Sequence, residues 1–132
     1  MAARCYCGYL RLRALLRLTW IAGVIVVIVG TLLPGNSAPI KALDLLDVND
    51  KVEHFAAYTA LGLLPALHER RRIVGILAVA LVALGILLEF GQLLSPGRDF
   101  EIGDMVADAA GVCVGVSIGW LLRGRTGRYL RD

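Results

Sequence analysis

Residues 70–94 read RRRIVGILAVALVALGILLEFGQLL. Three arginines precede an apolar stretch, residues 73–94, in which Glu89 is the one charged side chain. At ~1.5 Å per residue, a helix of this length covers the ~30 Å hydrocarbon core of a bilayer. The stretch therefore predicts a membrane-spanning helix with the arginines at one membrane face and Glu89 toward the other.

Three further apolar stretches flank this segment, at residues 18–33, 50–67 and 102–122. Eleven of the fourteen Lys and Arg residues lie on alternate connections: Arg4, Arg11, Arg13 and Arg17; Arg70, Arg71 and Arg72; Arg123, Arg125, Arg128 and Arg131. Lys and Arg are retained at the cytoplasmic ends of membrane helices, so this alternation indicates the orientation. We predict an all-α fold, a four-helix transmembrane bundle with both termini in the cytoplasm.

The same reading divides the chain into a basic cytoplasmic tail (1–17), a membrane domain (18–122) and a second basic tail (123–132). Apolar residues make up 58% of the chain and the mean hydropathy is +0.70, which leaves no room for a separate soluble domain. The net charge of +3 is confined to membrane-flanking segments. These observations predict a cell-membrane protein whose partners are lipids, with no nucleic acid.

The first apolar stretch also resembles the core of a cleavable signal peptide. The one plausible cleavage site follows Ala38, with bulky Asn36 at the −3 position and Pro39 directly after the bond. Both features disfavour cleavage, so we expect an anchored helix that ends at Pro34-Gly35. Residues 40–46 beyond it are expected to form a short amphipathic turn at the outer surface.

Glycines recur every fourth residue in the last apolar stretch, at positions 111, 115 and 119. This spacing places them on one side of a helix, where the lack of side chains lets a second helix approach closely. We interpret the three glycines as a packing surface.

Most of the remaining polar residues fall at one end of the predicted bundle. The second span begins outside, the third ends outside and the fourth begins outside. Lys51 lies on this side, and eight further polar residues meet in the outer third: Asp50, His54, Tyr58, Glu89, Gln92, Arg98, Asp104 and Asp108. Within each span they share a helix face, because their spacings are three or four residues. This convergence predicts a polar pocket at the outer face.

Candidate catalytic residues are His54, Glu89 and Asp108. His54 is suited to proton transfer because its ordinary pKa is near neutrality, and a carboxylate can orient its ring. Glu89 lies inside its predicted span, where an ionisable group is costly and indicates a functional site by default. The structural alternative is that Glu89 only pairs with Arg98 or His54 and locks helices together.

The other members are candidate substrate-binding residues: Asp50, Lys51, Tyr58, Gln92, Arg98 and Asp104. Arg98 is suited to hold a phosphate or a carboxylate through two parallel hydrogen bonds. The chain has no His-Glu-x-x-His or comparable spacing of metal ligands, no Walker loop and no dinucleotide-binding motif. We therefore expect neither a metal nor another cofactor.

The ordered polar set resembles the VanZ-like family of small bacterial membrane proteins. The similarity extends over about residues 44–122. It rests on Asp50-Lys51-x-x-His54-Phe55-x-x-Tyr58-x-x-Leu61-Gly62, Glu89-x-x-Gln92, Arg98 and Asp104-x-x-x-Asp108-x-x-Gly111. The chain departs from the family at Asp108, where an asparagine is usual, so Asp108 is expected to be protonated or ion-paired.

The resemblance implies a multi-pass protein of the cell envelope with a site at these residues, and it transfers no reaction. Two classes of function follow. In the first, the protein acts on a lipid-linked or phosphate-bearing envelope substrate, with His54 and Glu89 in proton transfer and Arg98 on the anion. In the second, it is a non-catalytic accessory protein whose pocket binds a lipid headgroup, an ion or the helix of another membrane protein.

Overall fold

In a computed structural model, the described residues form five helices and no strand. The helices are α1 (Ala2–Leu32), α2 (Ala38–Asp44), α3 (Asp50–His68), α4 (Arg71–Gln92) and α5 (Ile102–Tyr129). The backbone is described for residues 2–44, 49–98 and 100–129, and the side chains for residues 11–41, 49–98 and 100–124. The expected all-α fold is confirmed.

The long helices follow the predicted spans closely at α3 and α4 and extend beyond them at the termini. The helix α1 begins at Ala2, so residues 2–17, which we expected as a tail, continue the first apolar helix. In the same way α5 continues past residue 122 to Tyr129. The expected amphipathic turn is found in part as α2, and its residues 45 and 46 lie outside the described part of the chain.

Three helices of the described chain are long and apolar enough to cross a membrane, over Arg11–Leu32, Arg71–Gln92 and Ile102–Gly124. The helix α3 is not among them, since charged residues occupy its first turn. These helices, in length and composition, are those of a membrane protein. The fourth crossing, by α3, stays a prediction.

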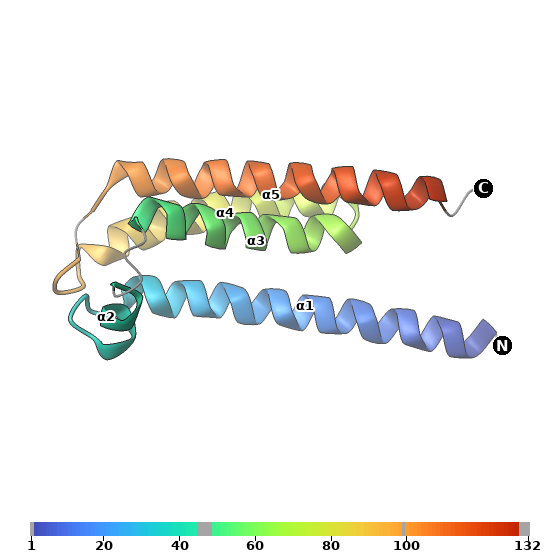
Figure 1. The fold of residues 1–132 in the computed structure, drawn as a ribbon, viewed down its shortest axis with the longest axis horizontal. Helices are drawn as coiled ribbons and strands as arrows, with labels where there is room; N and C mark the ends of the chain where they lie inside the picture. Colours follow the sequence, from blue (N-terminus) through green and yellow to red (C-terminus); the bar gives the residue numbers. More distant parts are fainter. Residues whose placement is uncertain (1, 45–48, 99, 130–132) are drawn as a thin grey trace.

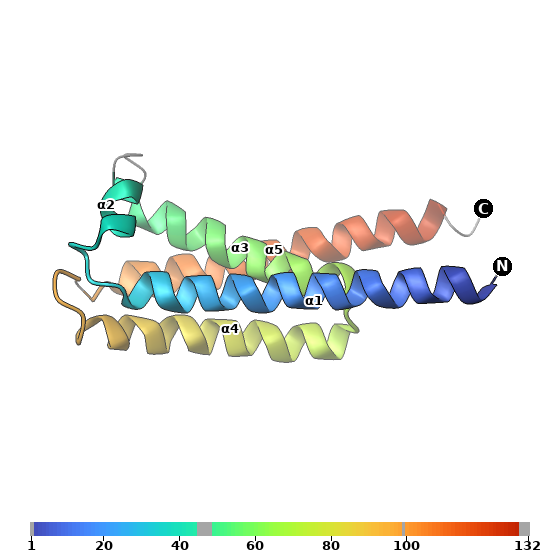
Figure 2. The same cartoon turned by 90° about the horizontal axis from the view of Figure 1, so that it is seen from below.

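The four long helices run side by side along one axis (Figures 1 and 2). The helix α5 lies on one side of α3 and α4, and α1 lies on the other side. The start of α1 and the end of α5 lie at the same end of the bundle, and α2 lies at the opposite end with the α4–α5 connection (Figure 1). We call this opposite end the polar end, because α3 begins there with Asp50.

Glycines allow α3 and α5 to pack with their backbones in contact. A Cβ atom at Gly111 would lie 2.6 Å from the carbonyl oxygen of Phe55, and one at Gly115 would overlap the carbonyl of Thr59. On the α3 side, a Cβ at Gly62 would lie 2.8 Å from the carbonyl oxygen of Val112. The small residues form the close helix–helix contact that the spacing predicted.

Two loops meet at the polar end and position the chain after α4. The Gly35 amide donates to the Pro96 carbonyl at 3.2 Å, and a Cβ at Gly35 would overlap the Gly97 carbonyl. Gly97 itself has φ +74°, a conformation that side chains other than glycine rarely adopt. The loop after α1 and the loop after α4 are therefore joined, and Arg98 follows directly from this junction.

At the other end, Glu69 fastens α1 to the α3–α4 turn. Its carboxylate accepts hydrogen bonds from Arg17 Nε at 2.7 Å and from Arg13 Nη2 at 3.3 Å. Arg123 of α5 donates to the Glu69 carbonyl. The Arg17 hydrogen bond, together with the nearby positive charges, lowers the pKa of the nearly buried Glu69 carboxyl. The carboxylate is therefore charged at neutral pH and binds α1, while the backbone carbonyl of the same residue binds α5.

We predict that Gly115→Ala lowers the unfolding temperature of the protein in detergent, with a loss of about 1–3 kcal/mol, because the added methyl group must separate α3 from α5. Gly75→Ala is the matched control, since a Cβ at Gly75 meets nothing within 4 Å. That variant should be neutral or stabilising by up to about 1 kcal/mol. Equal effects of the two substitutions would contradict the close α3–α5 contact.

Candidate functional site

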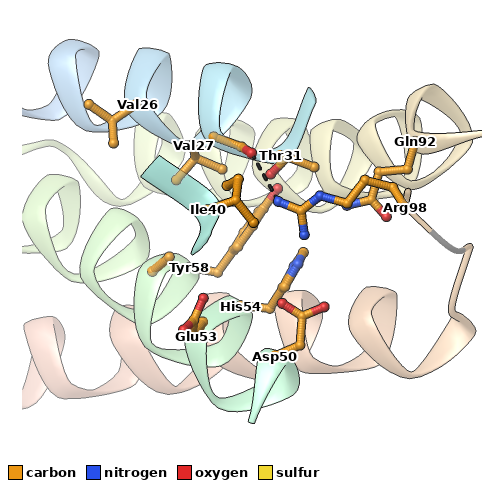
Figure 3. Close-up of a pocket in the computed structure, with 12 residues that line it drawn as sticks. Val26, Val27, Thr31, Ile40, Asp50, Glu53, His54, Tyr58, Gln92 and Arg98 are labelled. Carbon is orange, nitrogen blue, oxygen red and sulfur yellow. Dashed lines mark hydrogen bonds between the residues drawn. The ribbon is translucent and has the colours of Figure 1, made fainter. Parts of the chain in front are cut away.

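A pocket of about 210 Å³ opens at the polar end, between α1, α3 and the connection that follows α4. Its polar wall consists of Asp50, Glu53, His54, Gln92 and Arg98. Figure 3 shows the guanidinium of Arg98 and the imidazole of His54 directed toward each other, with Asp50 beside the imidazole. Charged and ionisable groups from three parts of the chain thus share one cavity.

The opposite wall of the pocket is largely apolar. Val26 and Val27 of α1 and Ile40 of α2 supply it, and Tyr58 extends from α3 toward Thr31 (Figure 3). The helix α1 presents a row of exposed apolar residues in this part of the chain, including Ile25, Val26 and Val29. The cavity is therefore amphipathic, with charge on one side and aliphatic surface on the side of α1.

A hydrogen bond between α3 and α5 fixes the ring of His54. Its Nδ1 lies 2.9 Å from Asp108 Oδ1, and the Asp108 side chain is only 2% exposed. A Cβ at Gly85 would overlap the carboxylate of Asp108, so this glycine of α4 makes the space that Asp108 occupies. The expectation that Asp108 is paired or protonated agrees with this geometry, because His54 is its partner.

This pairing determines which nitrogen of the ring is available to a ligand. A carboxylate accepts hydrogen bonds and donates none, so Asp108 favours the tautomer with the proton on Nδ1 of His54. In that tautomer the lone pair is on Nε2. When the ring is neutral, His54 therefore presents its unprotonated nitrogen on the side of the ring away from Asp108.

Arg98 is held by backbone carbonyls at the end of α1. Its Nη2 donates to the Gly30 carbonyl at 3.3 Å, and its Nε lies 3.4 Å from the Leu33 carbonyl. These carbonyls carry the negative end of the helix dipole and favour a cation there. Arg98 makes no ion pair with any carboxylate in the described part of the chain. Its positive charge is therefore available to an anionic ligand.

A second group of charges surrounds the start of α5. Lys51 pairs with Glu101, and its Nζ lies 3.6 Å from Asp104 Oδ1. Asp104 is buried, and its carboxylate lies near the carboxylate of Asp50 and the ring of His54. One oxygen or nitrogen atom from each of these three side chains lies within 4.8 Å of the other two. The start of α3 and the start of α5 together build this part of the site.

Glu89 lies behind the pocket and does not line it. It is fully buried, and its Oε2 accepts a hydrogen bond from the Glu101 amide at 3.2 Å. The ion pair with Arg98 or His54 that the structural alternative required is not formed among the described residues. Glu89 instead links α4 to the start of α5, because its carboxylate accepts a hydrogen bond from the backbone amide of Glu101.

The structure thus separates the nine predicted site residues into two groups. The pocket is lined by five of them: Asp50, His54, Tyr58, Gln92 and Arg98. The other four stand around it: Lys51, Glu89, Asp104 and Asp108. Asp108 forms a hydrogen bond with His54, and Asp104 lies close to the His54 ring. Lys51 and Glu89 are both bound by Glu101.

Sequence reasoning missed two residues that organise this site. Glu101 joins Lys51 to Glu89 through its side chain and its amide. Gly85 makes room for Asp108. A signal was present for Glu101, since it lies three residues before Asp104 in the acidic segment. Gly85 gave none, because one glycine in an apolar helix usually reflects packing alone.

The family model for VanZ/LLP1 matches residues 11–123 of the chain. No protein of curated function and no solved structure matches the sequence. The matched range includes the whole of the pocket and all nine predicted site residues. The chain belongs to the VanZ/LLP1 family.

Proposed function

We propose that this protein is a multi-pass protein of a bacterial cell envelope that binds and acts on a phosphate-bearing, lipid-linked substrate at the outer face of the cell membrane. In this proposal all four long helices cross the membrane and both termini lie in the cytoplasm. The polar end then faces the outer leaflet.

The arrangement of the helices supports four crossings. The helix α3 lies along α5 with backbone contacts at Gly111 and Gly115, so it occupies the same layer of the membrane as α5. The start of α1 and the end of α5 share one end of the bundle, as an even number of crossings requires (Figure 1). Arg70 lies between α3 and α4 at that end, and Arg71 and Arg72 begin α4, which favours a cytoplasmic position.

The observation that carries the functional proposal is that a guanidinium and an imidazole face the same pocket. Arg98 offers a positive charge without a carboxylate partner in the described chain, and His54 offers a ring nitrogen oriented by Asp108. A guanidinium suits phosphate oxygens, because its hydrogen-bond donors match their geometry. A neutral imidazole nitrogen is both a base and a ligand, and either property serves to activate a water or hydroxyl group toward a phosphate ester.

The apolar wall supports a lipid rather than a soluble phosphate. Val26 and Val27 belong to α1, which packs less extensively on the other helices than α3 does on α5. An isoprenoid or acyl chain lying along α1 would continue the apolar wall into the membrane, with its phosphate at Arg98. The cavity, with charge at Arg98 and aliphatic side chains along α1, is therefore complementary to a molecule with an anionic headgroup and an apolar chain.

Binding without turnover is the second candidate function, in which the protein is an accessory that holds a lipid headgroup. The lining of the pocket favours it in one respect. Among the described residues that line the cavity there is no Ser or Cys, the side chains that most often form covalent intermediates. Release of free phosphate from a bound substrate would distinguish the enzyme from the accessory protein.

We predict that the purified protein binds a monophosphorylated isoprenoid alcohol more tightly than the same alcohol without phosphate. Arg98→Gln should weaken binding of the phosphorylated form by about tenfold or more, because a hydrogen bond to a charged group contributes about 1.5–3 kcal/mol. Native mass spectrometry or calorimetry in detergent measures both ligands.

Lys41→Gln is the matched control for this measurement, since Lys41 is an exposed cation near the same end and does not line the pocket. Its affinity for the phosphorylated alcohol should stay within about twofold of the original protein, as a rim charge contributes little. An equal loss in both variants would reduce Arg98 to a general electrostatic role, and no preference for the phosphorylated alcohol would exclude the proposed substrate class.

The proposed topology predicts opposite accessibility at the two ends of α3. In a cysteine-free background, Asn36→Cys before α2 should react with a membrane-impermeant thiol reagent in intact cells. Arg70→Cys between α3 and α4 should react only after the membrane is permeabilised. Both positions are exposed in the structure, so burial does not explain a difference. Labelling of both from outside would mean that α3 does not cross the membrane.

A further inference from the structure

Asp50, His54 and Asp104 form a compact set of possible metal ligands at the polar end. One carboxylate oxygen from each aspartate and one ring nitrogen of His54 all lie within 4.8 Å of one another. The residues come from the first two turns of α3 and the first turn of α5, and the glycine contacts hold those two helices together. Their spacing in the sequence forms no metal-binding motif, because the set is assembled from two helices.

The position of Asp108 is that of an outer-shell partner of a metal ligand. A histidine that binds a metal through one ring nitrogen almost always donates the other N–H to a carboxylate, a carbonyl or water. Here Asp108 Oδ1 lies 2.9 Å from Nδ1 of His54 and is buried. This arrangement leaves Nε2 of His54 to bind a metal ion, and it fixes the plane of the ring before any ion binds.

A buried oxygen at the site lacks a hydrogen-bond partner. Asp104 is 2% exposed, and its Oδ1 accepts no hydrogen bond in the described part of the chain. The nearest cation, Lys51 Nζ, lies at 3.6 Å and is engaged by Glu101. A buried carboxylate oxygen in this state is expensive unless a charge compensates it, and a cation between Asp104 and Asp50 would do so.

The balance of charge at this end also favours a cation. Among the described side chains that line the pocket or surround it, six are acidic and two are basic: Asp50, Glu53, Glu89, Glu101, Asp104 and Asp108; Lys51 and Arg98. Arg98 is held by the Gly30 carbonyl of α1 and forms no ion pair with these carboxylates in the described structure. The side of the site near Asp104 is therefore the acidic side.

We propose that Asp50, His54 and Asp104 bind one divalent transition-metal ion, with Asp108 orienting the histidine. One nitrogen and two carboxylate oxygens suit Mn²⁺ or Zn²⁺, and water or a phosphate oxygen would complete the coordination. The site faces the pocket through Asp50 and His54, so a bound ion would stand opposite Arg98. A phosphate in the pocket would then lie between two positive charges.

The cation site goes beyond the proposed function and does not depend on it, since the three ligands are present without any lipid. The proposed substrate gives it a use, because a divalent ion would offset the acidic side of the pocket when a phosphate binds. Metal binding is therefore measured in the absence of lipid. If no metal binds, the Arg98-dependent binding of lipid is still tested by its own measurement.

The test is a titration of Mn²⁺ into the chelator-treated full-length protein in detergent, followed by electron paramagnetic resonance of the free ion. Mn²⁺ suits this test because it prefers oxygen and nitrogen ligands, so the thiols of Cys5, Cys7 and Cys113 compete little. We expect saturable binding of one ion per chain. His54→Gln and Asp104→Asn should each remove this binding, and Asp108→Asn should weaken it by about 10–100-fold, the usual effect of losing an outer-shell partner.

Two further variants keep the test decisive. His68→Gln removes the other histidine of the chain, at the opposite end of α3, and should bind Mn²⁺ as the original protein does. Asp50→Asn changes an exposed ligand, so it should weaken binding even if a buried substitution prevents folding. Absence of saturable binding by the original protein would overturn the proposal. So would binding that survives in Asp50→Asn and in a folded His54→Gln protein.

Discussion

Burial of three carboxylates in an apolar bundle is the constraint on which the rest of this structure depends. Glu89, Asp104 and Asp108 are each at most 2% exposed, although their helices are built largely of aliphatic residues. A buried carboxylate is tolerated when a donor or a positive charge faces it. His54 forms a hydrogen bond with Asp108, and the Glu101 amide donates one to Glu89. Lys51 is the cation near Asp104. Each solution joins two segments, so the starts of α3 and α5 and the end of α4 must meet.

The helices divide this task unequally. The contact of α3 with α5 is close because glycines replace side chains along it, and it carries the His54–Asp108 pair at one end. The polar contacts of α1 are few: Glu69 binds it near its middle, through Arg17, and Arg98 binds it at its end, with the Trp20 indole donating to the Leu61 carbonyl between them. The pocket therefore has one rigid polar wall and one apolar wall that is attached through few polar contacts.

The sequence was sufficient for the elements and for the convergence of the polar residues, because both follow from simple periodicity. Apolar runs and their breakers placed α3, α4 and the start of α5 within a few residues, and the four-residue glycine spacing identified the face of α5 that packs on α3. The length of α1 was missed, since the alanines, leucines and arginines before residue 18 are also good helix formers and continue the helix.

Individual partners could not be predicted, because they depend on side-chain reach across helices. His54 lines the pocket, yet nothing in its own segment selects Asp108 over Glu89 as its partner. Gly85 decides the matter, since only an empty position on α4 admits the Asp108 carboxylate. The grouping of Asp50 and His54 with Asp104 was also not predicted, because Asp104 belongs to a different helix and lies far from the other two in the sequence.

The most direct test of this account is the tautomer of His54, read by nitrogen-15 nuclear magnetic resonance of the histidine-labelled protein. Only two histidines are present, so a His68→Gln sample assigns the signal. The account predicts that, at a pH where the ring is neutral, its proton is on Nδ1 and Nε2 is unprotonated, and that Asp108→Asn loses this preference. A His54 ring with its proton on Nε2, unchanged by Asp108→Asn, would contradict it.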